Sequence, residues 1–277
     1  MSVLVGFDDT LCGHDALGLG RLLSQLVLEP MLVAAVWPEH DTGLSLTMHD
    51  LQWVGEQRQR AQEMLETART ILGDSATADY QIVGPASAPA GLHSLAEELT
   101  ASAIVVGSGA DAAIGRLSPG STSERLLHGA PCPVAVAPRG YRFREVDATV
   151  RTVAVAYVDS DEGREALELA ASIGQRTGAH LLVLTVTERP ESVASEQLAN
   201  EAAEAAPGLA SSVEVLTGRD VAAALAKRSE HEIDLLVCGS RGYGPVRSVL
   251  LGGVSRRLVR TAACPVLIVP RGGPRPS

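Results

Sequence analysis

The chain has 277 residues, a formal net charge of −10 at pH 7, 45% hydrophobic residues and only 3% aromatic residues. This length is sufficient for two domains that each bury a core, and the aliphatic composition favours parallel strands covered by helices. The acidic balance argues against duplex nucleic acid as a partner, and no apolar run approaches the roughly 18 residues that a membrane span needs.

The start of the chain has no basic leader, and Asp8 and Asp9 interrupt its early apolar run. We therefore expect neither a signal peptide nor insertion into a membrane. The four cysteines show no Cys-x-x-Cys spacing, and we interpret them as small buried thiols in a reducing cytoplasm. A bridge between Cys132 and Cys264, which stand at equivalent strand starts, stays open.

The first half of the chain alternates between predicted strands and helices. An apolar run at 3–7 predicts a buried strand, and the helix after it has leucines at helical spacing. Residues 32–36 predict a second strand. After an irregular segment at 38–50, apolar residues recur from 51 to 72 on one face of a predicted helix. The remaining elements are a strand at 79–83, a helix at 92–99, a strand at 103–106, a helix at 122–128 and a strand that follows Cys132.

The second half repeats this order. Residues 3–37 match positions 150 further along, and the closing segment at 130–140 matches 262–272, including Cys-Pro-Val and Pro-Arg-Gly. Such self-similarity indicates a duplicated domain. The predicted strands lie at 153–157, 182–186, 212–216, 235–238 and after Cys264, and predicted helices lie near 193–206, 221–228 and 254–261.

Each half thus predicts a five-stranded parallel sheet with helices on both faces, wound by right-handed crossovers. We expect two domains, at 1–141 and 150–277. The junction between them is too short for a free linker, so we expect the two halves to pack together.

A glycine-bearing loop follows the fourth strand of each half. The first reads Gly107-Ser108-Gly109-Ala110, nine residues, then Gly120-Ser121-Thr122-Ser123; the second reads Gly239-Ser240-Arg241-Gly242, nine residues, then Gly252-Gly253-Val254-Ser255. Glycine lets a backbone approach a ligand closely, and the N–H groups at a helix start attract anions. The carboxyl edge of such a sheet is where ligands usually bind. The shared spacing therefore favours a phosphate site over glycines that serve only a turn.

With these features the sequence resembles the universal stress protein family in its tandem form. The resemblance rests on Asp8 after the first strand, on the two glycine patterns and on the Cys-Pro-Val strand of each half. It implies two Rossmann-like domains of the adenine nucleotide α-hydrolase-like type, paired as a pseudo-dimer through their final strands. It also implies, for one subgroup, binding of ATP, with or without Mg²⁺, at the glycine motif. Members typically regulate stress survival or dormancy and are not dedicated catalysts.

The resemblance assigns the nucleotide to a defined set of residues. In the first half these are Asp8, Val36, Gly107, Gly109, Gly120, Ser121, Thr122 and Ser123, and in the second half Gly239, Gly242, Gly252, Gly253, Val254 and Ser255.

Each half departs from the family pattern at different positions. Ala110 replaces the second glycine of the first loop. If that position needs a positive φ, alanine would be strained there, although the neighbouring Gly109 could take over the role of the glycine. The second half has Val158 where the first has Asp8, and Gly253 in place of a hydroxyl residue, although Ser255 could cap the helix. We therefore expect the first half to be the stronger ATP site.

Two alternatives to a nucleotide-binding regulator remain open. The chain could be an interaction scaffold that has lost ATP, or an enzyme of the same fold that cleaves or transfers adenylate. A missing Ser-Gly-Gly-x-Asp-Ser loop and a single lysine, Lys227, argue against the enzyme. The seven histidines lack metal-ligand spacing. Association of two chains through another surface also stays open.

Arginines flank both glycine loops in the sequence. Arg116 and Arg125 accompany the first loop, and Arg241, Arg256 and Arg257 accompany the second. Because a guanidinium can pair with phosphate, we treat these side chains as candidate phosphate partners.

Overall fold

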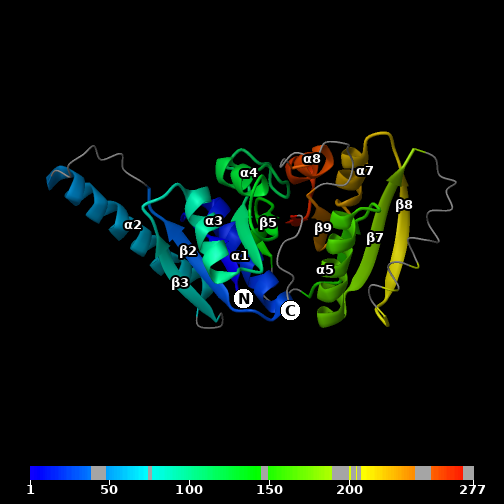
Figure 1. The fold of residues 1–277 in the computed structure, drawn as a ribbon, viewed down its shortest axis with the longest axis horizontal. Coiled ribbons are helices and arrows are strands. Elements are labelled where there is room, and N and C mark those ends of the chain that lie inside the picture. The colour runs from blue at the N-terminus through cyan, green and yellow to red at the C-terminus, as the bar shows by residue number, and fades with distance from the viewer. Residues whose placement is uncertain are drawn as a thin grey trace.

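Ten strands form one continuous sheet in the computed structural model, with one half of the chain on either side of its centre (Figure 1). The structure describes residues 1–38, 48–73, 77–144, 149–188, 207–240 and 251–270, together with residues 200 and 204. The strand order is β3-β2-β1-β4-β5-β10-β9-β6-β7-β8. Within each half all strands pair in parallel, which confirms the predicted fold class.

The elements follow the predicted order. The first half contains β1 (Val3–Gly6), α1 (Leu11–Val27), β2 (Met31–Val36), α2 (Met48–Leu72), β3 (Ala78–Val83), α3 (Ala88–Leu99), β4 (Ala103–Gly107), α4 (Ser121–Leu127) and β5 (Val134–Ala137), followed by the short 3₁₀ helix η1 (Tyr141–Phe143). The second half contains β6 (Thr152–Ala156), α5 (Asp161–Thr177), β7 (His180–Thr187), β8 (Ser211–Thr217), α7 (Val221–Arg228), β9 (Leu235–Gly239), α8 (Gly253–Thr261) and β10 (Val266–Val269). Apart from residues 200 and 204, the helix predicted near 193–206 lies outside the described residues.

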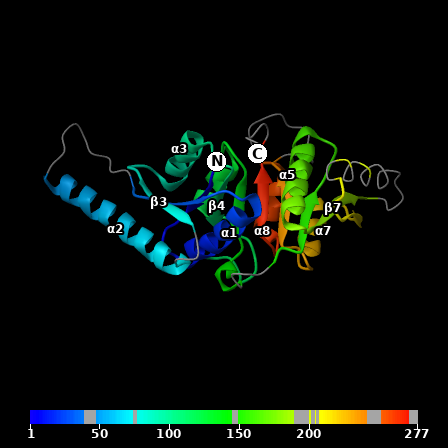
Figure 2. The ribbon, with the colours of Figure 1, turned by 90° about the horizontal axis from the view of Figure 1, so that it is seen from below.

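Alternation along the strands divides the core into two layers. Val3 and Val5 of β1 pack on the side of α1, α2 and α5, whereas Leu4 packs on the side of α3, α4, α7 and α8. Both layers are aliphatic, as the composition predicts. At the outer end of the first half, α2 extends well beyond the sheet (Figure 1 and Figure 2).

The two halves join through their final strands. β5 and β10 pair antiparallel, with Val134 opposite Ile268 and Val136 opposite Val266. This confirms the expected pairing within the chain. It also satisfies the backbone groups of two strands that would otherwise be exposed sheet edges.

A buried carboxylate fixes the chain where it leaves β5. Asp15 of α1 is fully buried, and its oxygens accept the N–H groups of Gly140 and Arg142, both at 2.9 Å. The Arg142 guanidinium donates to the same carboxylate at 3.0 and 3.1 Å. The turn after β5 is therefore bonded directly to α1.

A second carboxylate fixes the start of the second half. Asp234 accepts hydrogen bonds from the Arg144 guanidinium and from the N–H groups of Arg151 and Thr152, at 2.7, 2.7 and 3.1 Å. Burial raises the pKa of Asp234, but these hydrogen bonds outweigh it and hold that pKa below its ordinary value.

The four cysteines are unpaired thiols. Cys132, Cys238 and Cys264 are buried, and burial raises the pKa of each to about 12. Cys12 is only partly buried, so the expectation of burial is wrong for this residue. Among the described residues, no helix is both long and apolar enough to cross a membrane.

We predict that Asp15→Asn lowers the free energy of unfolding by about 3 kcal/mol, because it leaves a largely buried guanidinium without its counter-charge. Urea unfolding of the full chain measures the change. Asp79→Asn, at an exposed position of β3, is the matched control and should leave stability within about 0.5 kcal/mol. Equal stability of the two variants would contradict a structural role for the Asp15 carboxylate.

Candidate functional site

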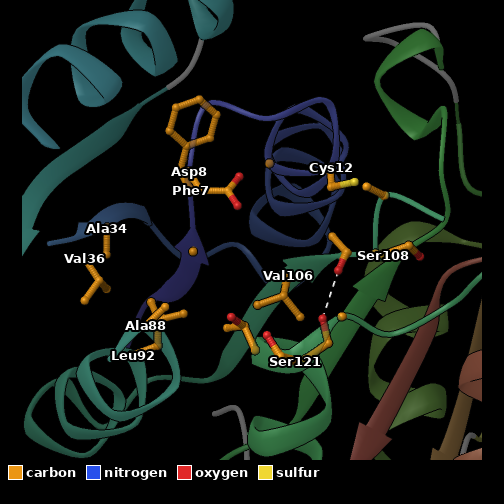
Figure 3. A pocket seen from close by; sticks show the side chains of 18 residues that line it. Phe7, Asp8, Cys12, Ala34, Val36, Ala88, Leu92, Val106, Ser108 and Ser121 are labelled. Atoms are coloured by element: carbon orange, nitrogen blue, oxygen red, sulfur yellow. Dashed lines mark hydrogen bonds between the residues drawn. The ribbon is translucent and has the colours of Figure 1, made fainter. Parts of the chain in front are cut away.

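A cavity of about 230 Å³ opens at the carboxyl ends of β1, β2 and β4 in the first half (Figure 3). Its lining includes every residue that the sequence assigned to the first-half site: Asp8, Val36, Gly107, Gly109, Gly120, Ser121, Thr122 and Ser123. These residues come from four separate segments of the chain. The structure thus brings the predicted set together.

One wall of the cavity is apolar. Ala34 and Val36 come from β2, Leu92 from α3 and Val106 from β4 (Figure 3). Gly6 keeps this wall open, because a Cβ there would lie 2.6 Å from Leu92 Cδ1. The resulting surface suits a flat apolar group.

Sequence reasoning missed most of this wall and its surroundings. The unpredicted lining residues are Gly6, Phe7, Cys12, Gly13, Ala34, Ala88, Leu92, Val106, Ser108 and Ala110. Alternation along β2 indicates that Ala34 shares a face with Val36. Nothing in the sequence shows that α3 leaves this end of that face uncovered.

Among the described residues, Asp8 is the only charged side chain in the lining. Its Oδ1 accepts hydrogen bonds from the N–H and the hydroxyl of Thr10, at 3.2 and 2.7 Å. Thr10 in turn caps α1 by accepting the Gly13 N–H. Within the part of the chain that the structure describes, Asp8 Oδ2 accepts no hydrogen bond, and Figure 3 places this exposed carboxylate beside Phe7.

The glycine at the end of β4 has a packing role of its own. A Cβ on Gly107 would fall on the carbonyl group of Cys12, so only glycine lets the start of α1 come this close. Gly239 is equivalent, because a Cβ there would lie 2.9 Å from the carbonyl oxygen of Glu162. These two glycines are therefore explained without a ligand.

The loop between β4 and α4 closes on itself. Gly109 donates its N–H to the carbonyl of Ser118 at 2.5 Å, and a Cβ on Gly120 would lie 3.6 Å from Gly109 Cα. Ala110 does not have a positive φ, so the strain that a positive φ would have caused does not arise at this position. The loop reverses instead at Gly115, where φ is 75°.

The first turn of α4 presents backbone donors to the cavity. Gly120 is the N-cap and provides no side-chain hydrogen bond. The N–H groups of Ser121, Thr122 and Ser123 have no acceptor among the described residues. These are three of the unpaired donors that every helix start leaves, and they can bind an anion.

The serine at the third position of each helix has a structural bond instead. Ser123 Oγ donates to the carbonyl of Gly107 at 2.9 Å, and Ser255 Oγ donates to the carbonyl of Gly239 at 2.8 Å. The expectation that Ser255 caps α8 is wrong, because the N-cap of that helix is Gly252.

The arginines are less involved than the sequence suggested. Arg116 turns to the second half, where it pairs with Glu230, and Arg257 pairs with Asp220. Neither Arg116 nor Arg125 lines the cavity. Arg139, which donates to the carbonyl of Ala110, is a cation at the rim that the sequence did not indicate.

The equivalent positions of the second half differ in size and polarity. The strand pairs Gly6–Ala34 and Ala156–Leu184 occupy the same registers, so two small residues are replaced by larger ones. Val158 occupies the position in the second half that is equivalent to Asp8. Gly239, Gly252, Gly253, Val254 and Ser255 lie at the carboxyl end of β9 and the start of α8, as predicted, whereas Gly242 and Arg241 lie outside the described residues.

Comparison with known proteins agrees with the duplication. The model of the Universal stress protein family matches residues 1–138 and again 149–270. The chain belongs to the universal stress protein family. Because the family model matches twice, the tandem form is confirmed.

Relatives of this universal stress protein cover either the whole chain or one half. A universal stress protein of Mycobacterium tuberculosis is 27% identical over 98% of this chain and 100% of its own length. One of Thermus aquaticus is 32% identical over 43% of this chain and 98% of its own length. The solved structure of a universal stress protein from Archaeoglobus fulgidus has a TM-score of 0.74 at 24% identity, covering 98% of this chain and 96% of its own. The similarity to the Archaeoglobus fulgidus structure supports the assigned fold.

We predict that Gly107→Ala destabilises the chain by about 1–3 kcal/mol, because the added methyl group meets backbone of α1 that cannot move independently. Gly253→Ala is the matched control. A Cβ there has no atom within 4 Å, so stability should be unchanged or rise by up to about 1 kcal/mol. Thermal or urea unfolding measures both, and a tolerant Gly107 would contradict the packing explanation.

Proposed function

We propose that the first half binds Mg-ATP in this cavity, and that the protein regulates stress survival or dormancy through nucleotide-dependent conformation or partner binding. It is proposed as a regulator and not as a dedicated catalyst, and we place it in the cytoplasm. One observation carries the proposal. The cavity combines an apolar wall, a carboxylate with a free oxygen and a row of unpaired N–H groups.

Each part of a nucleotide has a complementary surface. The apolar wall of Ala34, Val36 and Leu92 suits the adenine ring. Asp8 Oδ2 can accept a hydrogen bond from a ribose hydroxyl or an amino group. The N–H groups of α4 suit phosphate oxygens. The volume is below the roughly 300–1,000 Å³ of cavities that enclose a whole drug-sized ligand, so we expect the nucleoside inside and the phosphates along the rim.

The charges favour the magnesium complex over free ATP. Among the described residues, no lysine or arginine lines the cavity, Arg139 lies at its rim, and the chain carries a formal net charge of −10. One arginine and three N–H groups supply less positive charge than a triphosphate carries negative charge. A divalent cation bound to the phosphates would offset the remaining repulsion, and the hydroxyls of Ser121 and Thr122 at the start of α4 could serve as oxygen donors.

The second half is proposed as a weaker or altered site. Leu184 and Ala156 take up space that Ala34 and Gly6 leave open, Val158 cannot accept a hydrogen bond, and Gly253 has no hydroxyl. A homodimer would have to use another surface, since the final strands are already paired within the chain.

The alternative is a scaffold that binds no nucleotide, and one experiment separates the two. Protein purified from cells is denatured, and the released small molecules are analysed. Near-stoichiometric ATP, with a rise in melting temperature on adding Mg-ATP, supports the regulator. No nucleotide and no shift would support the scaffold, whereas ATP hydrolysis abolished by Asp8→Ala would favour an enzyme.

We predict that Asp8→Asn weakens Mg-ATP binding about tenfold, since loss of one hydrogen bond to a charged acceptor costs about 1.5 kcal/mol. Calorimetry on the full chain measures the dissociation constant. Asp159 follows Val158, the residue equivalent to Asp8, and its side chain is exposed. Asp159→Asn is therefore the matched control, and this variant should bind Mg-ATP as the wild type does. A larger effect at Asp159 than at Asp8 would place the site in the second half and contradict the proposal.

A further inference from the structure

The loop that lines the cavity at both ends contacts the other half of the chain in its middle. Residues 107–110 and 120–123 line the cavity. Between them, Leu117 donates its N–H to the carbonyl of Ala262 at 3.1 Å. Its side chain is buried in the same core layer as Leu258 and Ala262 of the second half. One loop therefore belongs to the site and to the contact between the halves.

Arg116 provides the C-terminal end of α8 with a cation. That helix ends at Thr261, and the last carbonyl groups of a helix have no partner within it. Arg116 Nη1 donates to the carbonyl of Thr261 at 3.3 Å, and its Nη2 donates to Glu230 Oε1 at 2.5 Å. A positive charge at this end of a helix is also favourable for its dipole. The hydrogen bond from Arg116 lowers the pKa of Glu230, so the pair is charged on both sides at neutral pH.

Two residues separate Leu117 from the part of the cavity lining that begins at Gly120. After Leu117 come Ser118, whose carbonyl accepts the Gly109 N–H, and Pro119, which pairs with Ser108 in an isolated bridge. Gly120 follows as the N-cap of α4. The first half holds the neighbouring residues itself, because Gly115 donates to the carbonyl of Arg139 at 2.8 Å and Arg139 donates to that of Arg116 at 3.1 Å. The contact of Leu117 and Arg116 with the second half is therefore a further support of the loop, placed between the two segments that line the cavity.

A second contact between the halves supports the first helix turn directly. Glu124 of α4 pairs with Arg260 of α8. The sequence does not repeat either pair in reverse: the residues equivalent to Arg116 and Glu230 are Ser248 and Glu98, and those equivalent to Glu124 and Arg260 are Arg256 and His128. The residue types of the two ion pairs are therefore not repeated at the equivalent positions.

We propose that Arg116 is a positioning residue for the nucleotide, through which the second half holds the 107–120 loop in its binding conformation. This inference rests on the proposed function of the cavity. Because coupling between two sites is reciprocal, a bound nucleotide strengthens the contact with α8 and with Glu230. The surface of the second half around α8 and the end of α7 is then where occupancy of the first-half site is communicated.

The test compares Glu230→Gln with Glu66→Gln in the full chain. Glu66 is exposed and bonded to Arg69 within α2, so both substitutions remove one paired surface carboxylate. We expect Glu230→Gln to weaken Mg-ATP binding about three- to tenfold in calorimetry. This is near the low end of the coupling between two sites in proteins, because the Arg116–Glu230 ion pair is partly exposed. Glu66→Gln should have no effect. Arg116→Lys keeps the charge but loses the two-pronged geometry, so its affinity should fall between those of the wild type and Glu230→Gln.

Hydrogen exchange without nucleotide gives a second and independent measurement. Peptides covering residues 107–124 should exchange faster in Glu230→Gln, and those from α2 and β3 should not, which excludes a general loss of stability. If the wild type binds no Mg-ATP, the proposed function fails, and this exchange still decides whether the second half holds the loop. Unchanged exchange, or faster exchange with unchanged affinity, would overturn the positioning role.

Discussion

The antiparallel pairing of β5 with β10 is the constraint on which the rest of the molecule depends. Each half is a sheet whose final strand would be an open edge, and the pairing of Val134–Val136 with Val266–Ile268 removes both edges. Because the pairing is antiparallel, the carboxyl ends of the two half-sheets point in opposite directions. The edge that carries the first-half cavity therefore lies beside the C-terminal end of α8, and this places Arg116 and Leu117 against the second half.

The glycine pattern combines two separate physical requirements. Gly107 and Gly239 are needed because α1 and α5 approach the strand ends too closely for a side chain. Such a requirement persists in both halves whether or not a ligand binds. The residues that could distinguish a binding site lie elsewhere. The first half has the small pair Gly6 and Ala34 where the second half has the larger pair Ala156 and Leu184. A shared motif can therefore be kept by packing alone, and it is the lining around it that separates the halves.

Sequence reasoning recovered the fold because duplication supplied each pattern twice. The apolar strands and the crossover helices follow from periodicity that the two halves share, and the pairing of the final strands was implied by the family resemblance. It also collected the first-half residues that line the cavity, since the ends of parallel strands meet at one edge. It left the strain at Ala110 open and failed at Ser255, where backbone torsions and hydrogen-bond geometry decide the outcome. It failed at Arg116 as well, because proximity along the chain does not show that a long side chain turns toward another domain.

The asymmetry of the halves extends from the cavity to their contact. Arg116 of the first half donates to the carbonyl of Thr261 at the end of α8, whereas the residue equivalent to Arg116 in the second half is the uncharged Ser248. The two halves therefore carry different residues at the positions that make this contact. With the smaller lining residues also in the first half, the arrangement favours a nucleotide in that half and a response at the surface of the other. Two separate copies of one domain, each with the same sequence, could not make this distinction, whereas two halves of one chain can diverge independently.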